Sequence, residues 1–364
     1  MDALPGQDRP EVRISDPGEV AAALPHLLGF HPRESVVLIG LGGRSGGRVG
    51  LTVRADLPRA GDAAVAARRL TRSLCSDRPT GALVVVVSEA PDDPDLDAAP
   101  GGLPPGGTGL PHRGLAHQLL LALDAAGVGV RDVLLVRRGR WWSYDCPYPC
   151  CAPSAGTPLP EGVSELAAAA VTTGQVVAPD RAALAARIAA PPDRGGMLAG
   201  CLRAAGHCSA RLREVGRAGL ADESWAAVRH AVDRCRPGAP DGPPDDDVIA
   251  RLLWGLRDAQ VRDRALQLAL GADAAAAEQL WSECTRRAPS PLGAAPATLL
   301  AVSVWLRGDG AMANVALDRA LGDDPHHGLA RLLRQALDAC LGPADLRQLV
   351  ERAQGAAARR DPGG

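Results

Sequence analysis

The sequence predicts an N-terminal domain with a mixed α/β sheet, followed by an all-α domain built from helical hairpins. Up to about residue 190, short β-branched runs alternate with amphipathic segments, which is typical of strands alternating with helices. Residues 191–364 carry alanine-rich helical segments and no strand pattern. A chain of 364 residues is long enough for two or three domains with separate cores. We therefore expect domains at 1–190 and 191–364.

The chain begins with a predicted helix and two predicted strands. In "SDPGEVAAALPHLLG", Ser15 or Asp16 can cap a helix, Pro17 suits its first turn and Gly29 ends it. Pro25 lies inside this pattern, so we expect a kink or a break there. The runs "ESVVLIGL" and "RVGLTVRADL" predict strands, and the intervening "GGRSGG" predicts that they form a hairpin.

Two more helices and three more strands follow in the predicted order. "DAAVAARRLTRSLC" and "HRGLAHQLLLALDAAG" predict helices, and Gly127 ends the second. The apolar run "GALVVVVSE" predicts a central strand in which Val84–Val87 are all buried. Residues 90–108, rich in Pro, Gly and Asp, predict a flexible surface loop. "VRDVLLVRRG" and "RWWSYD" predict a final hairpin. Hairpins predict antiparallel pairs and intervening helices predict parallel pairs, so the sheet should be mixed.

The C-terminal half contains an internal similarity. Two stretches align, Ala265–Pro289 and Ala301–Pro325. The matched positions include Ala277 with Ala313 and Trp281 with Leu317. Small and large residues at these spacings resemble the tetratricopeptide pattern, in which small residues allow helices to approach and a proline ends the unit. A generic array of helical hairpins in an alanine-rich chain is the alternative.

Composition and charge exclude some common functions. The formal net charge is −2 and basic and acidic residues are interspersed, so the sequence gives no signal of nucleic-acid binding. No apolar run approaches the length of a membrane helix, and the polar N-terminus has no hydrophobic signal region. Nine scattered cysteines fit buried thiols in a reducing compartment. We therefore expect a cytoplasmic protein that does not enter a membrane.

The sharpest feature is a cysteine-rich loop at residues 145–153, within "RWWSYDCPYPCCAPSAGTP". Cys146, Cys150 and Cys151 are candidate metal ligands, and zinc is the metal such a cluster would hold. A rigid structural loop is the reading we favour, and a reactive thiol is the third possibility. Adjacent cysteines rarely both face one small ion. A fourth ligand would have to come from elsewhere, and His112 and His117 are the nearest histidines in sequence.

Three other residues are candidates for a ligand-binding site. His31, in "GFHP", follows the first helix, where an imidazole can act as a base, a ligand or a helix cap. Trp141 and Trp142 are neighbours on a predicted strand, so they should point to opposite faces. We expect one of them to pack beneath the cysteine-rich loop and Tyr144 to flank it. Trp142 and Tyr144 therefore join His31 as candidates.

Several motifs in a fixed order carry a resemblance to a known family. They are "LPHLLGFHP" followed by "ESVVLIGL", then "VRADLP", "GRWWSYDCPYPCCAPSAGTPL" and "WLRGDGAMANVALDRAL". Together they resemble the predominantly actinobacterial family known as domain of unknown function 4192. The resemblance covers most of the chain, and it implies a lineage and a compartment but no activity.

Two functional hypotheses follow from the sequence. The first is a non-catalytic interaction or regulatory protein that binds a protein partner through its helical domain, because no recognised catalytic motif is present. The second is an enzyme or small-ligand-binding protein with a site near His31 and Cys146–Cys151. Its basis is the concentration of Cys, Trp and Tyr in a proline-stiffened loop.

Overall fold

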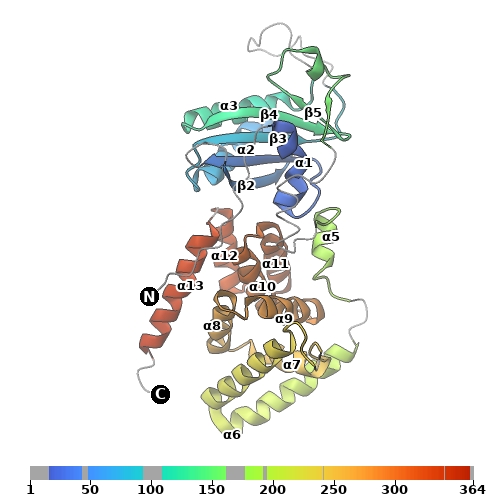
Figure 1. Ribbon diagram of the computed structural model, residues 1–364. Coiled ribbons are helices and arrows are strands. Elements are labelled where there is room, and N and C mark those ends of the chain that lie inside the picture. Colours follow the sequence, from blue (N-terminus) through green and yellow to red (C-terminus); the bar gives the residue numbers. More distant parts are fainter. Residues whose placement is uncertain are drawn as a thin grey trace. The chain divides into compact units, whose positions relative to one another are not determined.

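A computed structural model describes residues 16–42, 48–92, 109–160, 177–191, 195–240, 242–339 and 341–360. The chain divides into two compact units, residues 1–181 and 182–364 (Figure 1). The domain limits expected from the sequence, 1–190 and 191–364, stay a prediction. The predicted loop at 90–108 falls largely outside the described residues, and so does the tip of the first hairpin.

The first unit contains a mixed sheet, as predicted, but it has six strands rather than the expected five, because the short strand β6 was not predicted. The strand order is β2-β1-β3-β4-β5-β6. The strands are β1 (Ser35–Gly42), β2 (Arg48–Asp56), β3 (Gly81–Val87), β4 (Gly129–Arg137), β5 (Arg140–Ser143) and β6 (Thr157–Pro158). Only β3 and β4 pair in parallel, and the other four pairs are antiparallel. A helix separates β2 from β3 in the sequence, but these two strands do not pair with each other, because β1 lies between them in the sheet.

Helices α1 (Pro17–Leu28), α2 (Ala63–Cys75) and α3 (Arg113–Ala125) accompany the sheet, with a short 3-10 turn η1 (Ala60–Asp62) before α2 (Figure 1). Helices α2 and α3 pack against each other and share one apolar cluster with alternate residues of β1, β3 and β4. Because α1 contacts β4 and both sets of alternate residues in β3 are buried, β3 is covered on both faces. Val84, Val85 and Val86 confirm the predicted central strand, whereas Val87, at its end, is only half-buried.

The first helix begins and ends where its sequence predicts. Asp16 is the cap, and its carboxylate accepts a hydrogen bond from the Gly18 N–H at 2.8 Å. Gly29 adopts the left-handed conformation (φ 75°) that ends the helix. The break expected as one alternative at Pro25 is wrong, because α1 runs from Pro17 to Leu28 as one helix, and the other alternative, a kink, stays a prediction. Pro25 falls in the last turn, so few backbone hydrogen bonds are affected.

All the named elements of the second unit are helices. Its elements are α5 (Arg181–Ala186, beginning at the division), α6 (Gly195–Arg234), α7 (Asp246–Gly255), α8 (Ala259–Gln267), η3 (Leu268–Leu270), α9 (Ala274–Arg287), α10 (Ala294–Arg307), α11 (Gly310–Asp323), α12 (Gly328–Asp338) and α13 (Pro343–Arg360). Helix α10 packs against both α9 and α11. The aligned residues Ala277, Ala313, Trp281 and Leu317 are all fully buried. The tetratricopeptide-like character of this array stays a prediction. No described helix is both long and apolar enough to cross a membrane.

Candidate metal centre

The cysteine-rich loop connects β5 to β6 at one edge of the sheet. A 3-10 turn, η2 (Pro149–Cys151), holds its centre, and the Cys151 N–H donates to the Tyr148 carbonyl oxygen at 3.0 Å. The Gly156 N–H donates to the Cys150 carbonyl oxygen at 3.0 Å, which closes the loop behind the cysteines. The prolines fix φ at three further positions, so the loop has little conformational freedom to lose on folding.

The loop rests on Trp142, as one of the two sequence-based alternatives predicted. Trp142 is 3% exposed, and its indole Nε1–H donates to the Ala152 carbonyl oxygen at 3.0 Å. Gly156 lies so close that a Cβ there would be 2.4 Å from the Trp142 ring. The Arg137 guanidinium stacks over the same ring, 5.0 Å from its centroid. Trp141 is half-buried and lies against Gly18 at the start of α1.

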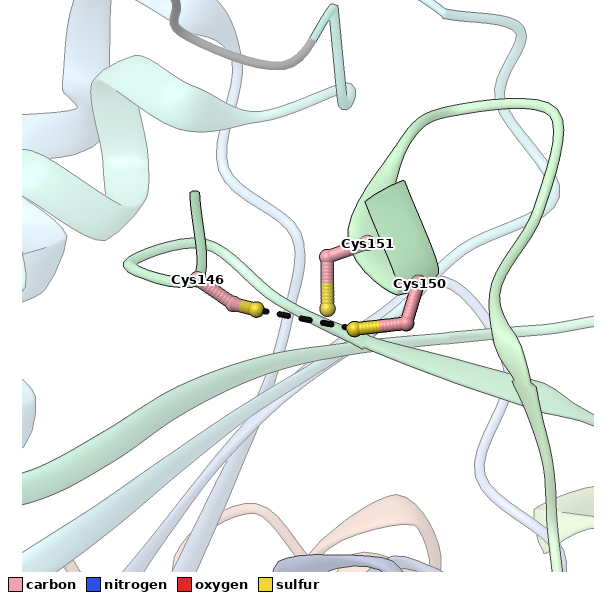
Figure 2. Close-up of side chains that lie close together, drawn as sticks. All are labelled: Cys146, Cys150 and Cys151. Atoms are coloured by element: carbon pink, nitrogen blue, oxygen red, sulfur yellow. Dashed lines mark hydrogen bonds between the residues drawn. The ribbon is translucent and has the colours of Figure 1, made fainter. Parts of the chain in front are cut away.

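Three sulfur atoms converge in this loop. The Sγ atoms of Cys146, Cys150 and Cys151 all lie within 4.8 Å of one another, and Cys146 and Cys150 are 3.7 Å apart (Figure 2). The adjacent Cys150 and Cys151 thus bring their sulfurs into one group, although neighbouring cysteines rarely face one small ion. Successive residues of a 3-10 turn are rotated by roughly 120°, rather than the 180° of a strand, so neighbouring side chains can converge.

A second layer of hydrogen bonds holds the sulfurs in place. The Ser143 N–H donates to the Cys151 Sγ at 3.3 Å, and the Ser143 hydroxyl donates to Asp132 Oδ1 at 2.6 Å. The Tyr144 hydroxyl donates to the Pro111 carbonyl oxygen at 2.5 Å, which ties the loop to the segment before α3. Metal-binding loops are commonly oriented by such outer contacts. Sequence reasoning did not find Ser143 or Asp132, because their role depends on the pairing of β4 with β5.

Burial and hydrogen bonding shift the pKa values of the thiols in different directions. The Tyr148 backbone N–H, which bonds to Cys146, lowers the pKa of that thiol, and contacts with the other two sulfurs add to the effect. Desolvation raises the pKa of Cys151 to about 12. Desolvation also raises the pKa of Asp132, against the hydrogen bond from Ser143. Cys151 is therefore a neutral thiol near neutral pH unless a cation lies beside it.

The predicted histidines do not join this group. His31 is exposed, and its backbone N–H donates to the Ala178 carbonyl oxygen at 3.1 Å. The His112 Nε2 instead lies 2.9 Å from the Ser88 hydroxyl, and His117 is exposed on α3. Among the described histidines, cysteines and acidic residues, only the three cysteines form this set of ligand atoms. All eight histidines of the sequence belong to the described residues.

Comparison with known proteins gives a family and no further relatives. A family model with the description "Domain of unknown function (DUF4192)" matches residues 17–344, which is most of the chain. No curated protein and no solved structure matches it. The cysteine cluster and its supporting residues all lie within the matched range. The chain therefore belongs to the DUF4192 family, as the order of its sequence motifs predicted.

Proposed function

We propose that this chain is a zinc-binding protein, and that Cys146, Cys150 and Cys151 supply three thiolate ligands to one ion. The observation that carries this proposal is the convergence of the three sulfurs. Zinc–sulfur bonds of about 2.3 Å in tetrahedral geometry place two sulfurs about 3.8 Å apart. The Cys146 and Cys150 sulfurs are 3.7 Å apart, so this pair fits zinc without rearrangement.

Charge favours a divalent ion at this position. Three thiolates carry a charge of −3, so a divalent ion leaves −1 and a monovalent ion leaves −2. The carboxylate of Asp132 acts electrostatically on Cys146, which makes further negative charge costly. Soft thiolate ligands select zinc over magnesium or calcium.

The fourth coordination position is not filled by any described residue. Cys150 is exposed and Cys146 is half-buried, so solvent can reach the sulfurs from this side. Three protein ligands with an open position characterise catalytic zinc sites, whereas structural sites usually have four. The open coordination position at the cysteines therefore supports the second sequence-based hypothesis, an enzyme or ligand-binding protein. His31 adds no support to it.

Elemental analysis of protein purified without chelator tests this proposal. We expect one zinc ion per chain, lost in the Cys146→Ser variant. Cys75→Ser is the matched control, because Cys75 is a half-buried thiol outside the cluster in the same unit. Protein that contains no metal would instead support a purely structural loop.

A second candidate function concerns the helical unit. Helix α6 is interrupted at Gly216, where φ is 70° and ψ is −179°. Before that point, one face of α6 packs on α7, and the Trp254 Nε1–H donates to the Cys201 carbonyl oxygen at 2.8 Å. The same stretch of α6 exposes four large apolar side chains: Leu198, Leu202, Leu212 and Val215. We propose that this face binds a helix of a protein partner, as expected of an interaction or regulatory protein.

A photo-crosslinking residue placed at Leu202, which is 76% exposed, tests this surface. In cells, we expect a discrete crosslinked protein from this position and none from Ala226, an exposed site later on α6. Equal crosslinking from both positions would contradict a defined binding face. We also propose a cytoplasmic location, supported by the eight described cysteines, all of which are free thiols.

A further inference from the structure

The three sulfurs of the proposed zinc site differ in their access to solvent. Cys150 is exposed, and its Sγ is in contact with the Sγ of Cys146 (Figure 2). Cys151 is buried in the apolar cluster that contains Trp142 and Tyr144, and its Sγ accepts the Ser143 N–H. A dissolved reagent therefore reaches Cys150 first, and the half-buried Cys146 is in contact with it.

We propose that Cys146 and Cys150 are a peroxide-oxidisable pair whose disulfide expels the bound ion, while Cys151 remains a thiol. This proposal rests on the proposed zinc function. It assigns the site a regulatory chemistry, in which hydrogen peroxide is the oxidant and metal occupancy is the output.

The reaction balances with one peroxide for each pair of thiolates. The Cys150 thiolate attacks one peroxide oxygen, the O–O bond breaks, and a sulfenic acid and a hydroxide form. The Cys146 thiolate then attacks the Cys150 sulfur, forms the S–S bond and releases the second hydroxide. The two sulfurs lose two electrons in total, and the two peroxide oxygens gain them.

Geometry selects this pair over the adjacent cysteines. Cα atoms joined by a trans peptide are 3.8 Å apart, whereas disulfides usually need about 4.4–6.8 Å. The Cys150–Cys151 peptide is trans, so a disulfide between these neighbours would be strained. Cys146 and Cys150 are separated by three residues. Their sulfur atoms are 3.7 Å apart, so the distance between them must shorten by less than 2 Å to reach the disulfide bond length of about 2.05 Å.

Oxidation removes the charge that holds the ion. A disulfide sulfur is no longer a thiolate, so only Cys151 would remain as a ligand from this set. One thiolate is insufficient for a zinc site, which uses three or four protein ligands. The ion should leave when the disulfide forms and return when a reductant reopens it.

The test uses the full chain loaded with zinc and treated with hydrogen peroxide in the presence of a chromophoric zinc chelator. We expect one zinc released per chain, a mass decrease of two hydrogens, and a Cys146–Cys150 linkage in the peptide map. Dithiothreitol and added zinc should restore the starting state. Cys75→Ser should behave as the parent protein does, because Cys75 is not part of the cluster.

The possible outcomes distinguish the failure of the redox inference from the failure of the zinc proposal. Zinc that remains bound while peroxide is consumed, or release with a linkage to Cys151, overturns the redox inference and leaves the zinc site standing. Protein that never binds zinc overturns the proposed function and metal release together. Peroxide treatment of that metal-free chain still tests the oxidisable pair, because mapping must then show the Cys146–Cys150 disulfide.

Discussion

Replacing Gly156 with alanine should disrupt the packing of the cysteine-rich loop against Trp142. Gly156 has φ +71°, and a Cβ would lie 2.4 Å from two atoms of the Trp142 ring. The left-handed backbone costs an L-residue roughly 1–2 kcal/mol. Forcing an extra carbon into this packed contact costs about 1–3 kcal/mol more. We therefore expect Gly156→Ala to lose about 2–5 kcal/mol of unfolding free energy.

Gly139 provides the matched control for this prediction. It also has φ +71°, in the tight turn between β4 and β5, but a Cβ there would have no neighbour within 4 Å. Gly139→Ala should therefore lose only the backbone contribution of roughly 1–2 kcal/mol. Urea unfolding followed by tryptophan fluorescence measures both variants, and the zinc content of each shows whether the sulfurs moved. Equal losses in the two variants would refute the proposed contact between the loop and Trp142.

Three further predictions concern the two cores and the thiols. Val85→Asp should unfold the first unit, because it buries an unpaired charge in a strand covered on both faces; a soluble variant with an unchanged melting temperature would contradict the central placement. Ala313→Leu should cost about 1–3 kcal/mol by overpacking, whereas Ala226→Leu, at an exposed helical position, should be nearly neutral by thermal unfolding. Zinc binding at pH 8 should release at least one proton, because the pKa of Cys151 is raised to about 12 and a zinc ligand must be a thiolate. Calorimetry in buffers of different ionisation enthalpy measures the number of protons released. Zinc binding without proton release would exclude Cys151 as a ligand.

The sequence predicted the first five strands because their signals are local, whereas the two-residue strand β6 has no such signal. The run that became β3 is continuously apolar, so its burial on both faces follows from composition alone. Val87 is less buried than its neighbours because it ends the strand, and strand limits depend on pairing partners. The position of β1 between β2 and β3 also depends on pairing between distant segments, which no single run of residues encodes.

The candidate site was predictable in its residues but not in its geometry. The cysteines and prolines are visible in the sequence, and Trp142 proved to be the tryptophan that lies beneath the loop. The 3-10 turn that brings Cys150 and Cys151 together is not encoded by their spacing. The contact of Ser143 with Cys151 arises where β5 ends, so it required the folded sheet.

X-ray absorption at the zinc edge of the purified full chain tests the central claim most directly. The account predicts three sulfur ligands at about 2.3 Å and one lighter ligand in a tetrahedral site, since the described residues offer three thiols and no fourth ligand. The Cys150→Ser variant should lose one sulfur neighbour or the metal itself. Zinc bound only to nitrogen and oxygen, or a spectrum unchanged in Cys150→Ser, would contradict the proposed thiolate centre.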